Sequence, residues 1–313
     1  MLGARAPSSS IGAVTRFRRI LVGVDLSLSG DRPTPGCTRA FEQALLVASR
    51  AGAELVVLHS TWADLHEENQ ALRSGPSSAG LRALEHLLER AAAASVQARL
   101  ALVRDRPWLE IIRAVQRDEA DLVMIARRNQ TGGGAALGGV TRKLMRKCPC
   151  PVWVVKPEGR VEPRVLVAAT DLTGVGNLAV ELAAFVAVLF QAELDVVHAW
   201  PLPLAVPVLP ELDVPAQSRI DVEQHERAAR ARFEQELAAL ALPLQPRAHL
   251  VCGAPSAAIQ EMVERRDADL LVMGSVSRTG IAGLLLGNTA ERLLDRVQCS
   301  LLTIKPRDFV SPV

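Results

Sequence analysis

Tyrosine is absent from this 313-residue chain, and aromatic residues make up only 3% of it. Proteins that hold single-stranded nucleic acid stack the bases on aromatic side chains, and this chain offers few of them. The formal net charge is only +2, which gives no general attraction to nucleic acid or to a membrane surface. We therefore expect no nucleic-acid partner.

Long apolar runs and cysteine motifs are missing as well. No apolar run reaches the roughly 18 residues that a membrane-spanning helix needs, so we expect no membrane span. The five cysteines contain no CxxC spacing, and Cys148 and Cys150 form the one close pair. Because the cysteine count is odd and the N-terminus lacks an apolar signal segment, we expect reduced thiols, no metal site and a cytoplasmic location.

What the chain does have is enough apolar sequence for two cores. Apolar residues make up 49% and charged residues 22% of it, as in globular proteins, and its length suits two domains of about 150 residues each. Short apolar runs alternate with helical periodicity, which is typical of βα units and a parallel sheet. In the first half we predict strands at 19–24, 55–59, 98–103, 122–125 and 152–155, and helices at 38–51, 81–95, 107–117 and 141–147. In the second half we predict strands at 165–169, 194–198, 248–251, 270–273 and 301–304, and helices at 178–191, 222–240, 256–265 and from 287 onward.

This order of elements occurs twice, and the residues of the two copies match in sequence. Segments 25–27, 53–59, 121–124 and 156–157 correspond to 171–173, 192–198, 269–272 and 305–306. Such matching in order indicates two copies of one domain. We expect a loose tail at 1–16, one domain at 17–157 and a second at 164–313, joined by a short linker with a proline at each end. The predicted fold class is α/β, with two tandem, open, five-stranded parallel sheets of Rossmann-like type.

The segment 270–306 reads as a strand, a loop rich in Gly, Ser and Thr, a helix with Glu291 in its first turn, and a final strand. A loop of this kind directs backbone N–H groups toward one point, which suits a phosphate. Small residues matter there because a Cβ atom keeps the backbone from approaching a phosphate closely. The segment is therefore a candidate anion site.

The same segment resembles the universal stress protein family, whose phosphate signature is Gly, two residues, Gly, nine residues, Gly, and then Ser or Thr. Gly274 and Gly287 fill the first and third positions of that signature. Ser277 stands at the second position and Asn288 at the fourth, with Thr289 directly after it. The stretches VSRTGI, LGNTAE and LLTIKP are most similar to the E-type tandem members of bacteria, and the resemblance covers roughly residues 18–313.

The resemblance implies that the second copy binds an ATP-type nucleotide, with Mg²⁺, beside the acidic residue that follows its first strand. The implied site consists of Asp171, Leu172, Thr173, Val197, Gly274, Ser277, Gly287, Asn288 and Thr289. The alternative is structural, because Asp171 and Asn288 are both residue types that cap helices. The resemblance further implies that the fifth strands of two such domains pair across a two-fold axis, here within one chain. A homodimer of the tandem chain remains open.

The first copy has lost this phosphate loop. Ala126 and Asn129 stand at the first two glycine positions, and Val140 follows Gly139 where a hydroxyl is expected. Cations gather there instead, namely Arg127, Arg128, Arg142, Lys143, Arg146 and Lys147. The cluster is either an anion site or a solvated helix face.

No residue is a candidate for catalysis, because the chain has no Ser-His-Asp order, no HExxH and no complete P-loop. His59 and His198 end matching strands, which favours a packing or hydrogen-bonding role for both. The first functional hypothesis is a non-enzymatic stress-response or regulatory protein with a nucleotide in the second copy. The alternatives are an apolar-ligand or lipid carrier, with the proline-rich segment 201–215 as a lid, and a slow ATPase. Segment 201–215 could equally be a loop packed on its own domain.

Overall fold

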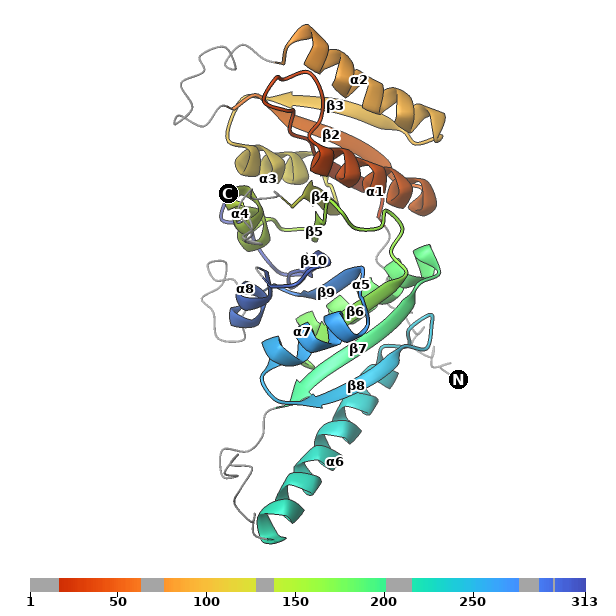
Figure 1. The fold of residues 1–313 in the computed structure, drawn as a ribbon, viewed down its shortest axis with the longest axis vertical. Helices are drawn as coiled ribbons and strands as arrows, with labels where there is room; N and C mark the ends of the chain where they lie inside the picture. Colours follow the sequence, from red (N-terminus) through yellow and green to blue (C-terminus); the bar gives the residue numbers. More distant parts are fainter. Residues whose placement is uncertain (1–16, 63–75, 128–137, 201–215, 276–286, 295) are drawn as a thin grey trace, which may run out of the picture.

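The computed structural model describes residues 17–62, 76–127, 138–200, 216–275, 287–294 and 296–313, and there the chain alternates strands and helices (Figure 1). The first copy consists of β1 (Arg19–Gly23), α1 (Pro35–Ala51), β2 (Glu54–Ser60), α2 (Ser78–Ala93), β3 (Ala98–Val103), α3 (Pro107–Asp118), β4 (Leu122–Ala126), α4 (Gly139–Lys147) and β5 (Val152–Val155). The second copy consists of β6 (Val165–Thr170), α5 (Gly174–Phe190), β7 (Glu193–Trp200), α6 (Ala216–Ala239), β8 (Arg247–Cys252), α7 (Pro255–Arg265), β9 (Leu270–Gly274), α8 (Asn288–Leu294) and β10 (Ser300–Ile304). The predicted α/β class is confirmed, while the expected tail at 1–16 lies outside the described residues.

Local sequence explains where the first helix begins and ends. Thr34 is the N-cap of α1, and its side chain accepts a hydrogen bond from the backbone N–H of Cys37. Pro35 occupies the first turn, where its missing N–H costs nothing. Gly52 ends the helix in the left-handed conformation, with φ of 66°. The helix therefore begins at Pro35 rather than at the predicted residue 38.

The strands of the described residues form a single ten-stranded sheet in the order β3-β2-β1-β4-β5-β10-β9-β6-β7-β8. Neighbouring strands within each copy are parallel, whereas β5 and β10 pair antiparallel. The pairing of the two fifth strands within one chain is thus confirmed. It joins the two predicted sheets edge to edge.

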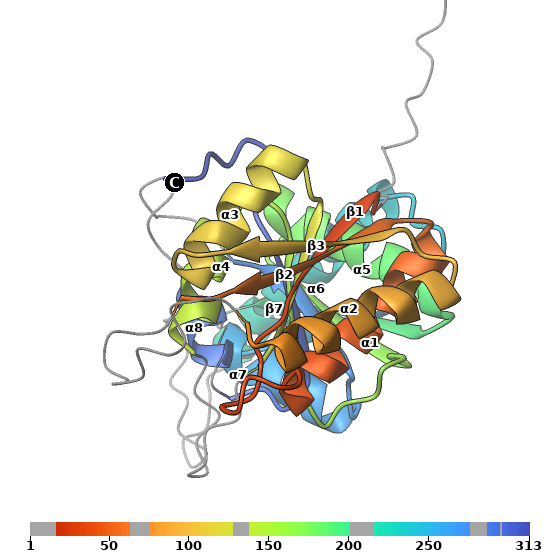
Figure 2. The same cartoon turned by 90° about the horizontal axis from the view of Figure 1, so that it is seen from above.

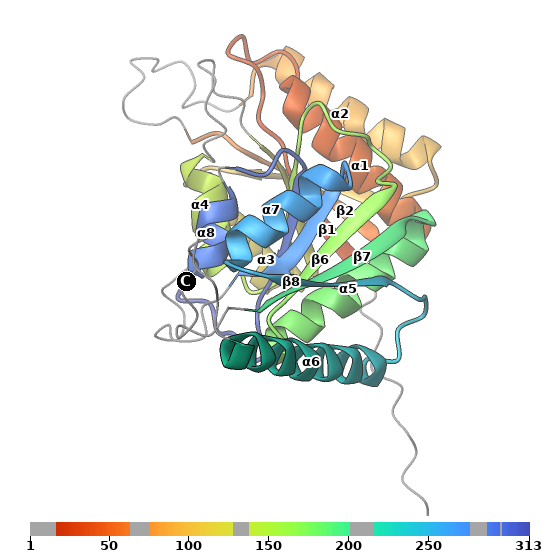
Figure 3. The ribbon, with the colours of Figure 1, turned by 60° about the horizontal axis from the view of Figure 1, so that its bottom comes forward.

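Helices cover both faces of the sheet and bury two apolar layers. One layer contains side chains of α1, α2, α5 and α6, and the other contains side chains of α3, α4, α7 and α8. Figure 2 shows α1 and α2 on one side of the strands and α3 and α4 on the other, and Figure 3 shows α6 lying beneath β7 and β8. Strand residues alternate between the layers, as Leu21 and Val22 do. No helix in the described ranges combines the length and the apolar character that crossing a membrane demands.

Contacts on both faces hold the two copies together. On one face, the buried ring of Phe17 packs edge-on against Phe185 of α5, with ring centroids 5.2 Å apart. The amide of Gln43 in α1 donates at 2.9 Å to the carbonyl of Val161, which lies in the linker between the copies. These contacts make the copies one packed body.

On the other face, two cations of the first-copy cluster reach the second copy. Arg127 is only 8% exposed and donates to the Val297 carbonyl at 2.8 Å. Arg146 pairs with Glu291 of α8 at 3.0 Å. Of the two alternatives for the cluster, the solvated helix face is therefore wrong for Arg127, which is buried because the second copy covers it.

Candidate ligand-binding site

The turn after β6 is built around Asp171. Its Oδ1 atom accepts hydrogen bonds from the backbone N–H and the hydroxyl of Thr173, at 3.1 and 2.5 Å. Thr173 is the N-cap of α5, and its hydroxyl oxygen accepts from the N–H of Gly176 at 3.3 Å. Asp171 therefore does not cap the helix itself but orients the residue that does.

Leu172, in the middle of this turn, has a left-handed backbone. Its φ is 59°, a conformation that costs a residue with a Cβ atom about 1–2 kcal/mol. The turn is held by the Thr170 hydroxyl, which accepts from the N–H of Leu172 at 3.0 Å. Strained backbone of this kind concentrates at binding and active sites, so it marks this turn as a candidate site.

Gly176 makes the turn possible, and no sequence pattern points to this glycine. A Cβ atom at this position would lie 2.6 Å from the Thr170 hydroxyl oxygen and 2.8 Å from Asp171 Oδ1. In the first copy the third residue after the N-cap is Cys37, whose sulfur accepts from the N–H of Asp25 at 3.2 Å. A compact acidic turn of this form is therefore specific to the second copy.

The corresponding turn of the first copy is longer than the repeat predicts. Leu26, matched to Leu172, pairs in an isolated bridge with Pro33 and does not have a positive φ. The N-cap of α1 is Thr34, so the predicted match of Ser27 with Thr173 is wrong. The residues between Leu26 and Pro33 form an extra loop, and α2 packs so closely on it that a Cβ at Gly80 would lie 2.3 Å from the Gly30 oxygen.

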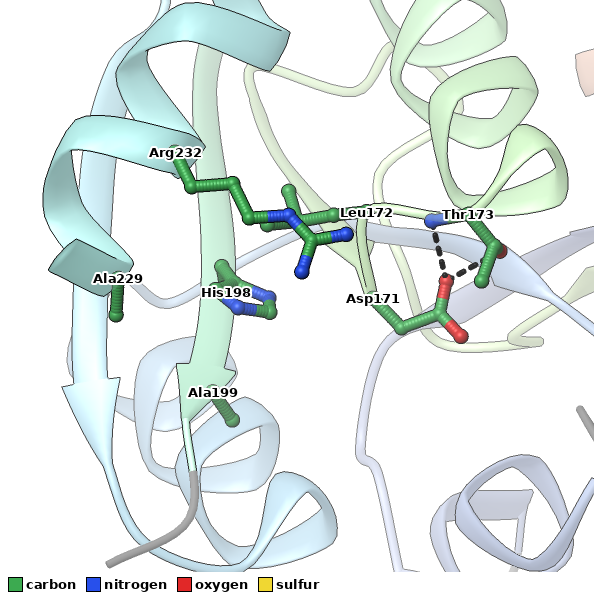
Figure 4. A pocket seen from close by; sticks show the side chains of 7 residues that line it. All are labelled: Asp171, Leu172, Thr173, His198, Ala199, Ala229 and Arg232. Carbon is green, nitrogen blue, oxygen red and sulfur yellow. Dashed lines mark hydrogen bonds between the residues drawn. The ribbon is translucent and has the colours of Figure 1, made fainter. Parts of the chain in front are cut away.

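A cavity of about 390 Å³ opens beside the acidic turn (Figure 4). Its lining residues come from the ends of β6 and β7 and from α6, and they are Asp171, Leu172, Thr173, His198, Ala199, Ala229 and Arg232. Ligands of parallel α/β sheets bind at the carboxyl ends of the strands, which is where this cavity lies. Its volume falls within the range of about 300–1,000 Å³ that is typical of small-molecule sites.

His198 forms part of the cavity wall and is fixed by its backbone partner. Its Nδ1 atom lies 2.9 Å from the Thr170 carbonyl, and since a carbonyl only accepts, Nδ1 carries a proton. His59 makes the matching bond to the Val24 carbonyl at 2.8 Å in the first copy. The predicted hydrogen-bonding role of this repeated histidine is confirmed.

Opposite charges face each other across the cavity. Figure 4 shows the guanidinium of Arg232 pointing from α6 toward the turn that carries Asp171. The carboxylate can accept hydrogen bonds from a ligand, and the guanidinium can donate to an anionic group. Nothing in the sequence distinguishes Arg232 from the other arginines of α6, so its role could be found only from the fold.

Two predicted site residues, Val197 and Gly274, are not among the described residues that line the cavity. Val197 is 1% exposed. Its side chain packs in the apolar layer on one face of β7, and that of Val196 packs in the layer on the other face. Gly274 ends β9, and a Cβ atom there would lie 2.9 Å from a methyl group of Val175. Close packing of β9 on α5 therefore already requires a glycine at 274.

The remaining signature residues lie around the start of α8, except for Ser277, which falls outside the described residues. Gly287 is buried, and its carbonyl accepts from the N–H of Glu291 at 2.9 Å. That bond makes Gly287 the N-cap residue of α8, with Asn288 and Thr289 in the first turn. Neither Gly287 nor Thr289 is among the described residues that line the cavity.

The fold and the cavity define a tandem α/β protein with a small-molecule cavity at the carboxyl ends of its parallel strands. Residues 16–156 and 163–305 each match the Universal stress protein family, and the chain belongs to that family. Universal stress protein E of Photorhabdus laumondii is 26% identical over 96% of this chain and 98% of the relative. Universal stress protein E of Escherichia coli K12 is 30% identical over 67% of this chain and 68% of the relative. A functionally unknown protein from Pseudomonas aeruginosa PAO1 shares the fold, with a TM-score of 0.73, 22% identity and 95% of each chain covered.

Proposed function

We propose that the second copy binds an ATP-type nucleotide in the cavity between β6, β7 and α6, and that the protein acts as a non-enzymatic ligand sensor in a stress response. The observation that carries the proposal is the cavity itself, with Asp171 on one wall and Arg232 on the other. A nucleotide suits both side chains. Its sugar and base can donate hydrogen bonds to the Asp171 carboxylate, and its phosphates can accept them from the Arg232 guanidinium.

Each lining residue has a role in this proposal. The Asp171 carboxylate accepts from ribose hydroxyls, as acidic residues near the ends of parallel strands do in dinucleotide-binding folds. Arg232 is exposed in the structure and donates to a phosphate with its planar fork. The side chains of Leu172, Ala199 and Ala229 offer an apolar surface to the base.

The proposal keeps the signature residues as candidates for the phosphate end of the ligand. These residues are Gly274, Ser277, Gly287, Asn288 and Thr289. Mg²⁺, if it accompanies the nucleotide, would supply positive charge that offsets the charge of the phosphates.

Binding is favoured over catalysis because two polar groups of the cavity, the Thr173 hydroxyl and His198 Nδ1, have structural partners. The Thr173 hydroxyl donates to Asp171 and caps α5, and His198 Nδ1 donates to a backbone carbonyl. A general base has to be within hydrogen-bond reach of a nucleophile, and these bonds do not provide that pairing. Release of ADP from ATP that persists after exhaustive purification and disappears in Asp171→Asn would show an ATPase instead.

Calorimetric titration of the full chain with ATP, AMP and inorganic phosphate, with and without Mg²⁺, tests the proposal. We expect Arg232→Gln to weaken ATP binding about tenfold, because a charge-assisted hydrogen bond to phosphate is lost. Arg230→Gln is the matched control, since Arg230 lies on the same helix, is exposed and pairs with Glu226 at 3.0 Å. No binding of any nucleotide by the wild-type protein, or equal losses in both variants, would overturn the proposal.

The carrier alternative involves segment 201–215, which lies outside the described residues. Native mass spectrometry of the purified protein separates the two hypotheses. A retained nucleotide supports the sensor. A retained long-chain amphiphile, lost when 201–215 is deleted and kept in Arg232→Gln, supports the carrier.

A further inference from the structure

Two cysteines that do not line the cavity lie side by side where the copies meet. Cys148 is the C-cap of α4, and Cys150 follows it after one proline, just before β5. Their sulfur atoms are 3.6 Å apart. Cys148 is buried, while Cys150 is only partly so. The pair is thus close enough to share a proton, and Cys150 is the less buried of the two residues.

A buried lysine from the second copy stands beside this pair. Lys305 directly follows β10 and is 5% exposed. Its Nζ atom donates to the Met145 carbonyl in the last turn of α4 and lies 3.5 Å from the Ser275 hydroxyl. Burial lowers the pKa of Lys305 to about 8, so the amine is still largely charged at neutral pH.

The surroundings of the two thiols determine which of them loses its proton more readily. A hydrogen bond from Cys150 lowers the pKa of Cys148, and the charge of Lys305 lowers it further. The same hydrogen bond, together with burial and the nearby charge of Asp121, raises the pKa of Cys150. Of the two thiols, Cys148 therefore loses its proton more readily, while the hydrogen bond holds the proton of Cys150 between the sulfurs. Transfer of that proton along the hydrogen bond to Cys148 makes Cys150, the less buried of the two residues, the thiolate.

We propose that Cys148 and Cys150 form an oxidation site that reacts with hydrogen peroxide and closes to a disulfide. The Cys150 thiolate attacks one peroxide oxygen, so that an S–O bond forms, the O–O bond breaks, and the departing hydroxide takes the thiol proton of Cys148 to become water. Cys148 then attacks the sulfenic sulfur as a thiolate. The S–S bond forms, the S–O bond breaks, and the departing hydroxide takes a proton from solvent to leave as a second water. The two sulfurs together supply the two electrons that reduce one peroxide.

This site does not depend on the proposed nucleotide cavity. Oxidation removes the negative charge that faces Lys305, the residue that links β10 to α4 across the two copies. The contact between the copies therefore changes with the redox state of the pair. The chemical class of the reactant is a small peroxide that can reach Cys150.

Two other cysteines of the same chain serve as internal controls. Cys252 is exposed but has no sulfur neighbour in the described residues, and partial burial and Glu226 raise its pKa. Burial raises the pKa of Cys299 to about 12. If exposure alone governed reactivity, Cys252 would be oxidised first. If the pairing of two thiols governs reactivity, Cys148 and Cys150 are oxidised before Cys252.

The experiment treats the full-length protein with limiting hydrogen peroxide, quenches it with acid, alkylates the free thiols and digests it with trypsin. Both cysteines of the pair fall in the fragment 148–160, because Lys156 precedes a proline and resists cleavage. We expect this fragment to lose two hydrogens, and its thiols to disappear at least about tenfold faster than that of Cys252 at neutral pH. Faster modification of Cys252, or an intact dithiol fragment while Cys252 is oxidised, would overturn the proposal.

Variants test the roles within the pair. Cys148→Ser should leave a sulfenic acid on Cys150 that dimedone traps, since no resolving thiol remains. Lys305→Gln should slow oxidation about tenfold at neutral pH, and Lys305→Arg should retain the rate, because only the positive charge is needed. If Lys305→Gln fails to fold, the comparison of the pair with Cys252 in the wild-type protein still decides the proposal.

Discussion

Trp153 of β5 lies opposite Leu302 of β10, and both side chains are fully buried. This antiparallel pair is the point at which the two copies become one sheet. The indole N–H of Trp153 has no hydrogen-bond partner among the described residues, so the ring contributes through packing alone. The joint between the copies is therefore apolar at its centre.

The first prediction concerns that joint. Trp153→Ala should lower the free energy of unfolding by about 3–5 kcal/mol, because it leaves a cavity where the copies meet. Trp153→Phe should cost less than about 1.5 kcal/mol, since it keeps most of the packing and removes a buried, unpaired N–H. Urea unfolding of the three proteins measures both values. Equal losses in the two variants would show that the ring does not act through packing.

The second prediction uses two glycines at the start of α5. A Cβ at Gly176 would overlap the Thr170 hydroxyl and Asp171, whereas a Cβ at Gly174 would meet nothing within 4 Å. Gly176→Ala should therefore destabilise the protein by about 1–3 kcal/mol, the usual cost of overpacking, and should weaken ligand binding. Gly174→Ala, the matched control, should be neutral or stabilising by up to about 1 kcal/mol, because alanine favours helix. Thermal unfolding and the nucleotide titration read out both effects, and a tolerated alanine at 176 would contradict this account of the turn.

The sequence could predict the strands, the helices and their twofold repetition, because apolar periodicity is local. Sequence reasoning also pointed to Asp171, which directly follows a strand. It could not point to Arg232 or Gly176, because their roles depend on distances between elements that only the folded chain sets. The burial of Arg127 was missed for the same reason, since the carbonyl of Val297 that it binds is far away in the chain.

The third prediction compares a buried and an exposed cation where the copies meet. Arg127→Met leaves the Val297 carbonyl without its guanidinium donor in a buried place, which should cost about 1–3 kcal/mol. Arg146→Met removes an ion pair with Glu291 in which both side chains are more than 40% exposed, and should cost less than about 1 kcal/mol. Urea unfolding at two salt concentrations distinguishes them, because only the exposed pair is screened by salt. A larger loss in Arg146→Met than in Arg127→Met would contradict the structure.

The last prediction follows from the pKa of Lys305, which burial lowers to about 8 from its usual 10.5. Between these two values the unfolded chain binds a proton that the folded protein does not, so the contribution of Lys305 to stability rises with pH in that window. Below about pH 8 both states are protonated and the cost of burying the charge is fully present. Wild-type protein should therefore gain stability relative to Lys305→Met by up to about 1.4 kcal/mol for each pH unit between 8 and 10.

Cys299 provides a control, because its contribution to stability changes with pH in the opposite direction to that of Lys305. Burial raises its pKa to about 12 from 9, so the folded protein holds a proton that the unfolded chain loses, and its contribution to stability falls as the pH rises above 9. Above pH 9, wild-type protein should thus lose stability relative to Cys299→Ala while it gains stability relative to Lys305→Met. Urea unfolding of the three proteins at pH 7, 8, 9 and 10 measures both slopes. A pH-independent difference between wild type and Lys305→Met would mean that the amine is not buried as a charged group beside the thiol pair.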